Sequence, residues 1–553
     1  NRTFFLPLRT FLFKIIKMKK LKLVCVAIAM ACATPTLAGG LLTNTNQHVA
    51  FNRMMSREAS IGIDGVYYNP AGVVFMGEGH HLAINWQLAF QTRTINNDYA
   101  LFTNNVNNPI TPRDFKGTAF APVIPSFQYA YNKGKWSFQA SFALTGGGGK
   151  CTFDDGLGSF EKIVAETAIA ACGLAGVVDQ TLGNTLGQPG MEMFTSDQAF
   201  GKTGKYSFNS YMHGRQYYYG LSVGAAYKFC DNFSAFLGVR GVYALTNYYG
   251  YVENINVGNM PLYKVLDPTK ESSANIELSC DQSGVGFTPI IGVDYKTGRW
   301  NFSAKYEFKT RIRLKNKSVN QTPSIGNLPA NLANQMTGIL TAKYQQAGLP
   351  LEQAKQQAEN TTNAVLNDPT VGATMMGLKT QFDQKLNKAI GEYEDGKKIA
   401  GDIPAYLALG VGYSPVDAVR VNVGFHWFDD KNATSYNNRN KELKRGTLEY
   451  NAGVEVDVNK KITLSTGWQN TNYGLSDEYM DDKSFVVSSN SVAIGGVYHI
   501  NKKMDLNVAY FHTFYQHKKT TEKVQLTADI SRNYSSDYTR NNNVFAVGLD
   551  INF

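Results

Sequence analysis

The sequence predicts an all-β protein, a transmembrane β-barrel of about 14 antiparallel strands with helical external loops. Three observations support this fold class. Short segments of alternating apolar and polar residues recur from residue 80 onwards, and after residue 38 no apolar run is long enough for a membrane helix. Tight turns and long polar connections alternate between these segments, as in bacterial outer-membrane barrels. The last segment ends on an aromatic residue, Phe553.

The first 38 residues are expected to be a leader with a cleavable signal peptide. A basic stretch at 18–22 leads into an apolar run at 23–33 and then into the small-residue end Thr36, Leu37 and Ala38. The apolar run is shorter than the roughly 20 residues that a membrane-spanning helix needs. Residues 1–17 precede a better start at Met18, so we interpret them as an over-extended reading frame, and we expect the mature chain to begin near Gly39.

The net charge gives no reason to expect nucleic acid as a partner. The formal value is +10, but seven of the basic residues lie in the leader, and without them 47 basic residues face 44 acidic ones. Four cysteines follow the leader, none in a C-x-x-C pair, so metal and redox motifs are weak. Cys151 and Cys172 are the favoured disulfide pair because both fall in one long loop, and the sequence leaves open whether they bond.

The alternating segments are read as strands because a period of two places apolar residues on one face. The clearest segments are 80–93, 136–145, 217–229, 233–245, 300–308, 419–427, 448–458, 462–468 and 544–553. Weaker candidates at 123–132, 285–295, 405–413, 492–500 and 504–512 bring the number to about 14, which is even, as bacterial barrels require.

The connections indicate the orientation. Tight turns at 132–135, 230–232, 296–299, 414–417, 459–461 and 501–503 separate long connections at 94–122, 146–215, 246–284, 310–404, 428–446, 470–490 and 513–541. Because periplasmic turns are the short ones, we expect both termini on the periplasmic side of a Gram-negative outer membrane. The terminal Phe553 is similar to the signal that such barrels present to their assembly machinery.

Two of the long loops, near 146–215 and 310–404, have helical patterns. Residues 160–179 are rich in small residues, and 371–393 carry one apolar stripe of Met375, Leu378, Phe382, Leu386, Ile390 and Tyr393. Met336, Ile339 and Leu340 begin another stripe. These stripes must pack on each other, cap the barrel mouth or bind an apolar ligand, for which Met375, Leu378, Phe382 and Leu386 are the candidates.

Residues 39–79 lie between the leader and the first strand, and they need a place inside or below the barrel. They contain Glu58 and Ala59, then Asp64, then Tyr68, Asn69, Pro70, Ala71 and Gly72. Pro70 fixes its own φ and favours extended backbone at Asn69, which predicts a rigid corner. This run resembles the FadL/TodX (OMPP1) family of outer-membrane transporters for long-chain fatty acids and other hydrophobic compounds. The resemblance covers 57–72 in motif and most of the mature chain in architecture.

The resemblance implies an N-terminal hatch at 39–79 that plugs the lumen of a barrel at 80–553. It also implies a low-affinity groove in the external loops, a tighter site in the lumen and a sideways exit at a kink in the third strand. Here the third strand runs into glycines, so Gly146 and Gly147 are the candidates for that opening, and a flexible loop start is the alternative. The longest helical loops follow strands three and seven, whereas the family builds its groove after strands five and seven.

No motif for catalysis or for a cofactor is found, and no metal site is expected. The sequence lacks His-Glu-x-x-His, Gly-x-Ser-x-Gly and the phosphate-binding loop, and His80 and His81 face opposite ways in a strand. A barrel hydrolase with triad residues scattered along the chain is left open. The chain is therefore not expected to be an enzyme.

The favoured function is a passive, hatch-gated channel for hydrophobic solutes such as long-chain fatty acids, with outer-membrane lipids around it. Lumen-facing Arg93, Arg240, Lys305 and Arg420 are candidates for binding a carboxylate headgroup, although an ordinary solvated lining explains them equally well. The alternative is a FadL-like accessory or shuttle protein of the type IX secretion system that binds exported proteins. A general porin is a third possibility. The sequence does not identify the solute or the oligomeric state.

Overall fold

The barrel is a closed ring of antiparallel strands. The structure is a computed structural model, and it describes residues 41–323, 328–526 and 530–553. Within these residues 14 strands form the ring, and β1 closes it by pairing with β18. They are β1 (Gly79–Tyr99), β2 (Arg113–Lys133), β3 (Trp136–Phe153), β4 (Tyr206–Cys230), β5 (Phe233–Val257), β7 (Ile276–Thr297), β8 (Trp300–Glu307), β11 (Tyr406–Val416), β12 (Val419–Phe428), β13 (Thr447–Asn459), β14 (Ile462–Asn472), β15 (Ser489–Asn501), β16 (Met504–Tyr515) and β18 (Ser531–Asn552). The predicted fold class is confirmed.

Several strands are longer than the sequence pattern predicts. β4 begins at Tyr206 rather than at 217, and β18 begins at Ser531 rather than at 544. A membrane needs only about 9–11 residues per strand, so the extra length projects beyond it, where the outward residues are polar and the alternation is lost. Further strands extend the wall on the same side: β6 (Met260–Pro261), β9 (Arg313–Gln321), β10 (Lys398–Ala400) and β17 (Lys518–Gln525).

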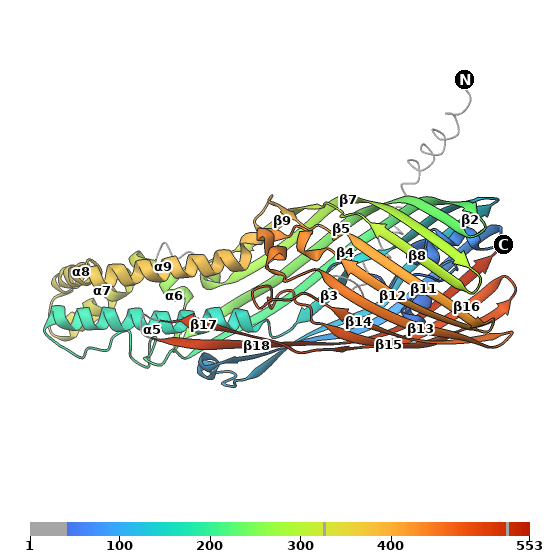
Figure 1. Cartoon of the computed structure of the whole chain (residues 1–553). Helices are drawn as coiled ribbons and strands as arrows, with labels where there is room; N and C mark the ends of the chain where they lie inside the picture. The colour runs from blue at the N-terminus through green and yellow to red at the C-terminus, as the bar shows by residue number, and fades with distance from the viewer. Residues whose placement is uncertain (1–40, 324–327, 527–529) are drawn as a thin grey trace, which may run out of the picture.

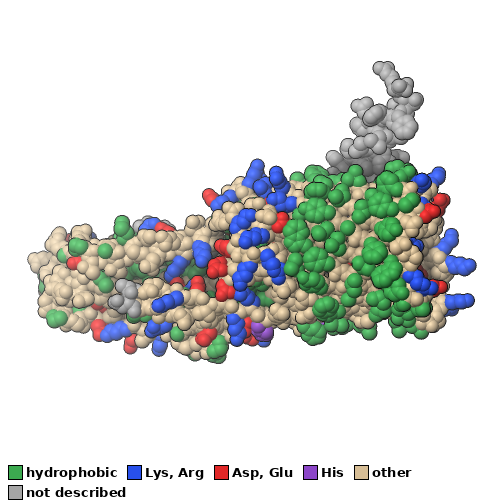
Figure 2. All heavy atoms as spheres, in the orientation of Figure 1, with side chains coloured by type: hydrophobic (Ala, Val, Ile, Leu, Met, Phe, Trp, Pro, Cys, Tyr) green, Lys and Arg blue, Asp and Glu red, His purple; other side chains and the backbone are tan. Residues whose placement is uncertain are grey.

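The outer face of the barrel is a belt of apolar side chains (Figure 2). On β7, for example, Val285 is 63% exposed and Phe287 70% exposed. Such a contiguous exposed apolar surface is costly in water and is stable in lipid, so the belt marks the membrane-spanning part. The tight turns and Phe553 lie at one end of the belt, which we call the turn end, and the long loops lie at the other, the loop end (Figure 1).

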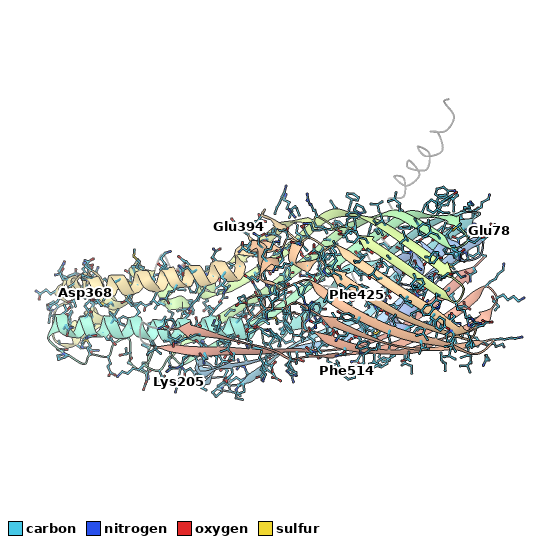
Figure 3. All side chains as sticks on the ribbon, viewed as in Figure 1. Glu78, Lys205, Asp368, Glu394, Phe425 and Phe514 are labelled. Carbon is cyan, nitrogen blue, oxygen red and sulfur yellow. The ribbon has the colours of Figure 1, made fainter. Side chains whose placement is uncertain are left out.

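Helices from the long loops form an elongated extension beyond the loop end (Figure 1). They are α5 (Gly158–Leu186), α6 (Tyr263–Leu266), α7 (Leu328–Gln346), α8 (Leu351–Leu366) and α9 (Pro369–Ile390), with short 3-10 turns η2 (Ala100–Asn104), η3 (Glu271–Ala274), η5 (Gly391–Tyr393), η6 (Asp430–Asn432) and η7 (Tyr436–Glu442). Asp368 caps α9 near the far tip, whereas Glu394 lies close to the barrel (Figure 3).

The prediction of helical external loops is confirmed. The loop at 310–404 also contains α8, a helix that the sequence pattern did not predict. By length and composition alone, one helix of the described residues, α5, could cross a membrane, and half of its most apolar part is buried. It packs against α8 and α9 in the extension.

The segment before β1 fills the inside of the barrel. Its elements are α3 (Val49–Met54), α4 (Gly65–Tyr68) and η1 (Gly72–Phe75). α3 contacts strands from β13 round to β1, α4 contacts β2 and β3, and η1 contacts β3, β4 and β7. Side chains from residue 43 to residue 59 are all buried. The predicted plug of the lumen is confirmed, whereas the expected leader at 1–38 lies outside the described residues.

The expected disulfide between Cys151 and Cys172 is wrong. Cys151, Cys172, Cys230 and Cys280 of the described chain are all free. Cys151 packs in a cluster at the barrel mouth, whereas Cys172 packs among the helices of the extension. From its start at Gly158, α5 rises about 21 Å before it reaches Cys172, because each helical residue adds about 1.5 Å.

Candidate functional site

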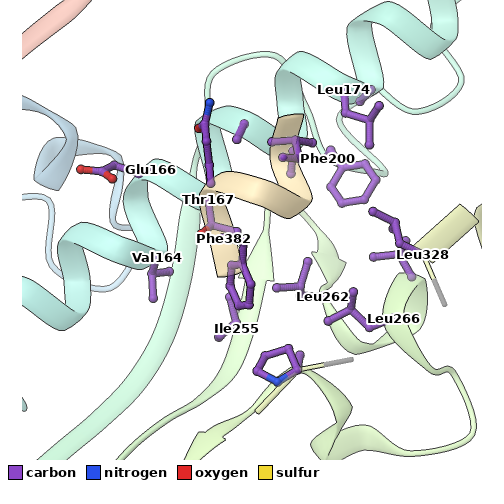
Figure 4. A pocket seen from close by; sticks show the side chains of 18 of the residues that line it. Val164, Glu166, Thr167, Leu174, Phe200, Ile255, Leu262, Leu266, Leu328 and Phe382 are labelled. Atoms are coloured by element: carbon purple, nitrogen blue, oxygen red, sulfur yellow. The ribbon is translucent and has the colours of Figure 1, made fainter. Parts of the chain in front are cut away.

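An apolar pocket lies between the helices of the extension (Figure 4). It has a volume of about 1110 Å³, including the part open to solvent. We call it the outer pocket. Val164 and Leu174 of α5, Phe382 of α9, and Leu262 and Leu266 from the loop after β5 are among its lining residues. Glu166 and Lys385 are the charged side chains that line it in the described chain, and Lys385 Nζ lies 2.5 Å from Glu166 Oε2, so each neutralises the other.

A second apolar pocket continues from the first toward the barrel. This inner pocket has a volume of about 680 Å³ and shares Ile163, Val164 and Phe382 with the outer pocket. Its other walls come from β4, β5 and β7, including Met212 of β4. Met212 also belongs to the buried apolar cluster at the barrel mouth, so the apolar side chains of the inner pocket continue into those packed at the mouth.

The candidate ligand-binding stripe on α9 divides along this route. Leu378 and Phe382 line the outer pocket, and Phe382 and Leu386 line the inner pocket. Met375 packs against the apolar cluster of the extension and lines neither pocket. The 3.6-residue period found the correct face of α9, but it could not show that α5 lies opposite that face.

The foot of α5 is fixed by a buried carboxylate. Ser159 N donates to Asp482 Oδ2 at 2.9 Å, and Tyr538 Oη donates to Asp482 Oδ1 at 2.8 Å. Burial, with the charge of Asp481 beside it, raises the pKa of Asp482. A carboxylate near the first turn of a helix also interacts favourably with the positive end of the helix dipole. The contacts of Asp482 therefore anchor the first turn of α5 to β18 of the barrel.

Below the mouth, two arginines stand side by side on the inner wall. Arg93 of β1 and Arg540 of β18 are directly opposite in register, and neither forms an ion pair within the described chain. Arg540 is 5% exposed. Its Nη2 donates to Gln91 Oε1 at 2.6 Å, and Arg93 Nε donates to the same oxygen at 3.2 Å. We call Gln91, Arg93, Arg540, Asn542 and Tyr515 the cationic layer.

The cationic layer has unused hydrogen-bonding groups. Nε and Nη1 of Arg540 and Oη of Tyr515 are buried without a partner among the described residues. The guanidinium carbon of Arg540 lies 5.2 Å from the centre of the Tyr515 ring. A buried cation without a counter-ion is costly, so the layer is suited to an anion. The buried apolar cluster at the barrel mouth, which we call the apolar mouth cluster, lies above the cationic layer. Its members Ile95 and Tyr538 occupy the next inward-facing positions on β1 and β18, nearer the loop end.

The other predicted headgroup ligands are already paired. Arg240 donates to Glu307 through both Nη atoms, at 2.5 and 3.1 Å. Lys305 Nζ donates to Tyr67 O of the hatch at 2.6 Å, and Arg420 forms two hydrogen bonds with Asp457. These three stabilise the wall and hatch. Sequence reasoning missed Arg540 because it assigned 513–541 to a loop, although strand parity extended back from 544 would have placed it inward.

The hatch motif forms a corner bonded to the wall. Asn69 Nδ2 donates to Asp294 Oδ2 of β7 at 2.6 Å, and Gly72 N donates to Asn69 Oδ1 at 3.1 Å. The carbonyl of Pro70 accepts from Gln139 of β3, and that of Ala71 accepts from Ser234 of β5, each at 2.7 Å. A side chain at Gly72 would collide with Asn69, so the corner needs glycine there.

Two buried charge clusters hold the rest of the hatch. Glu58 Oε1 lies 2.7 Å from His426 Nε2, and the opposite ring nitrogen of His426 lies 2.8 Å from Glu449 Oε2. Arg57 Nε lies 2.7 Å from Asp64 Oδ2, and Arg57 Nη1 lies 3.1 Å from Glu455 Oε1. The predicted motif residues Glu58 and Asp64 are therefore both buried in ion pairs of the segment that fills the lumen.

The wall is interrupted between β2 and β3. The strands pair from Gly117 to Thr118 of β2 and again from Phe127, and the intervening residues do not pair across this seam. Pro122 and Pro125 lie in this part of β2 and lack the N–H that a ladder needs. On β3 the register also shifts at Gly146 and at Gly147, where φ is +75°.

The start of the hatch occupies this interruption. Asn44 N donates to Thr145 O at 3.1 Å, and Gly147 N donates to Leu42 O at 3.0 Å. A side chain at Gly147 would lie 2.8 Å from the carbonyl oxygen of Gln216, so glycine is required by both φ and space. The segment that plugs the lumen is thus hydrogen-bonded to β3 at the gap in the wall.

Comparisons with known proteins agree with this architecture. No family model and no curated protein matches the sequence. A solved FadL homologue of Pseudomonas aeruginosa is 13% identical, and the match covers 93% of this chain and 100% of that chain with a TM-score of 0.57. This chain has the FadL-type fold.

Two toluene transporters also match over most of their length. TodX of Pseudomonas putida is 12% identical, with coverage of 89% of this chain and 94% of that chain and a TM-score of 0.47. TbuX of Ralstonia pickettii is 14% identical, with the same coverage and a TM-score of 0.43. The similarity to the FadL homologue confirms the predicted resemblance for the fold.

The pocket shows which loops of this chain contribute to it. The outer pocket is lined by α5 after the third strand of the ring (β3), by Leu262 and Leu266 after the fifth (β5), and by α9 after the seventh (β8). Three loops therefore contribute to the pocket, rather than the two that the resemblance implied.

Within the described residues no group of three or more His, Cys, Asp or Glu side chains is placed to hold a metal. The side chains of His80 and His81 form hydrogen bonds with different partners.

Proposed function

We propose that this FadL-type barrel is an outer-membrane channel of a Gram-negative cell that admits hydrophobic solutes by passive diffusion. The observation that supports it most directly is the pair of adjoining apolar pockets, whose lining continues into apolar side chains packed at the mouth of a plugged barrel; these form the route that we propose for the solute. The route begins in the extension, outside the membrane belt, and the wall gap at β2 and β3 gives it an end.

Capture would be driven by removal of apolar surface from water. Each buried methylene contributes about 0.8 kcal/mol, so a long acyl chain prefers the pockets to water by several kcal/mol. The half-exposed stripe of α9 makes the outer pocket accessible from solvent, because Phe382 and Leu378 are only partly buried. Movement inward requires no energy source, since the same apolar lining continues to the mouth.

The cationic layer favours an amphipathic anion as the solute, with a long-chain fatty acid as the best match. A carboxylate can accept from Arg540 at Nε or at Nη1, each of which lacks an acceptor within the described residues, while its chain remains against the apolar mouth cluster. TodX and TbuX are named as toluene transporters, and a neutral hydrocarbon would leave both arginines without a counter-ion. The charge therefore argues for the acid.

Residues 39–79 would act as the gate. The loop end would face the outside and both termini the periplasm, with Phe553 available to the assembly machinery. Movement of Leu42 to Asn44 away from β3 would open the wall at Gly146 and Gly147, so that the solute leaves sideways. The clusters around Glu58 and Asp64 would keep the rest of the hatch in place and the lumen closed to ions.

Solute capture can be tested with two variants of the same helix. Leu378→Ser with Phe382→Ser removes lining from both pockets, whereas Met376→Ser changes a side chain that is 73% exposed on the same helix. Radiolabelled oleate uptake into cells that lack other transporters should fall at least tenfold in the double variant and remain unchanged in Met376→Ser.

Equal uptake by all three proteins would contradict the route. If the wild type takes up no oleate and no toluene, and instead purifies with an exported protein, the type IX secretion role replaces the transport proposal.

A further inference from the structure

A row of basic side chains stands on the outside of the barrel just above the apolar belt. Lys309, Arg311, Arg313, Lys315 and Lys317 occupy alternate positions leading into and along β9. The last four are exposed, and Figure 2 shows Lys and Arg gathered at this edge of the belt, where Figure 1 places β9. Together with Lys398 of β10 we call this row the basic stripe.

The orientation of the stripe is fixed by the residues between its members. Ile312 is fully buried and Leu314 is 4% exposed, in a cluster with Ile399 on the inner side of the wall. Because side chains alternate along a strand, the basic residues must point outward.

The stripe directly adjoins the lipid-facing belt. A Cβ at Gly286 would lie 2.8 Å from Arg311 O, and one at Gly284 would lie 2.7 Å from Arg313 O. These glycines flank Val285, which is 63% exposed on the belt. Arg311 and Arg313 therefore lie at the height where acyl chains end and headgroups begin.

The charges of the stripe are poorly balanced. Lys315 and Lys398 are directly opposite in register, and like charges in that position repel. Arg313 has Asp402 at 2.8 Å, and Lys317 has Asp281 as its cross-strand neighbour. Arg311, Lys315 and Lys398 form neither an ion pair nor a side-chain hydrogen bond within the described residues.

We propose that the basic stripe binds the phosphate groups of a phosphorylated lipid in the leaflet at the loop end. The acyl chains would lie on the belt around Val285, and the phosphates would be held between Arg311, Lys315 and Lys398. Arginine binds phosphate through two parallel hydrogen bonds, and lysine adds a point charge. The proposal rests on the membrane orientation proposed above and is independent of the solute.

The test uses lipid A, a bisphosphorylated glycolipid, added in detergent micelles to the full-length barrel. Native mass spectrometry counts the lipid retained by the wild type, by Arg311→Gln/Lys315→Gln/Lys398→Gln, and by Lys133→Gln/Lys135→Gln/Lys503→Gln. The last variant makes the same change of charge at exposed turn-end positions.

We expect retention of lipid A to fall at least tenfold in the stripe variant and to stay near the wild-type value in the turn-end variant. Dephosphorylated lipid A should be retained weakly by all three. Equal retention by the wild type and the stripe variant, or an equal loss in both variants, would overturn the proposal. Oleate uptake by the stripe variant should remain normal, which separates this outcome from failure of the transport proposal.

Discussion

Replacement of Arg540 by glutamine removes the one fully buried guanidinium of the described lumen that we find without a carboxylate partner. The substitution keeps the side chain polar and of similar length, and its amide can still bond with Gln91. What is lost is a charge and the two donors, Nε and Nη1, that have no acceptor within the described residues. The effect should therefore fall on an anionic ligand and not on the empty barrel.

The magnitude follows from those donors. A hydrogen bond to a charged group contributes about 1.5–3 kcal/mol, so loss of the arginine should weaken fatty-acid binding by about 2 kcal/mol, which is about thirtyfold. The methyl ester of the same acid has no charge and should bind both proteins within about twofold of each other. Because Arg93 and Arg540 repel, Arg540→Gln should be at least as stable as the wild type.

Equilibrium binding of radiolabelled oleate and of methyl oleate to the barrel in nanodiscs measures the two affinities, and thermal unfolding measures the stability. Arg240→Gln makes the same substitution at another buried arginine and is the matched control. Because Arg240 forms an ion pair with buried Glu307, its loss should lower the free energy of unfolding by about 3 kcal/mol, although Lys305 still contacts Glu307. If acid and ester lose affinity equally in Arg540→Gln, or if neither loses any, the cationic layer does not bind the headgroup.

Three further predictions concern the hatch and its surroundings. Glu58→Ala leaves His426 without one of its two carboxylates, so stability should fall by about 3–5 kcal/mol and ion conductance in planar bilayers should rise; a closed, equally stable variant would contradict this. Gly147→Val forces a branched side chain into a φ of +75° and against a backbone carbonyl, so the midpoint of thermal unfolding should drop, and an unchanged midpoint would show that the strand relaxes freely. Burial raises the pKa of Asp430, in the loop after β12, from 3.8 to about 6, so its stabilising effect is present below pH 3.8 and is lost as the pH rises through 6. The stability of the wild type relative to Asp430→Asn should therefore fall by up to about 3 kcal/mol between pH 4 and pH 7 in urea unfolding, and a constant difference would exclude this titration.

The sequence by itself determined the barrel and the number of its strands. A lipid-facing strand must place apolar residues at every second position, and that period is visible without any partner strand, as in 80–93 and 233–245. The stripe on α9 was visible for the same reason, because a helix repeats every 3.6 residues. The corner at Asn69 to Gly72 was visible because proline and glycine restrict the backbone locally.

Tertiary structure alone decided which charged residues are free. Arg93, Arg240, Lys305 and Arg420 look alike in the sequence, but Arg240 pairs with a glutamate 67 residues away in the chain, whereas Arg93 faces a second arginine, Arg540, on the last strand. Barrel closure sets these distances, since it joins β1 to β18. The pockets are equally invisible locally, because three loops far apart in the chain meet only in the extension. The sequence period predicts which face of a strand or helix a residue occupies. Only the closed barrel determines which residues that face contacts.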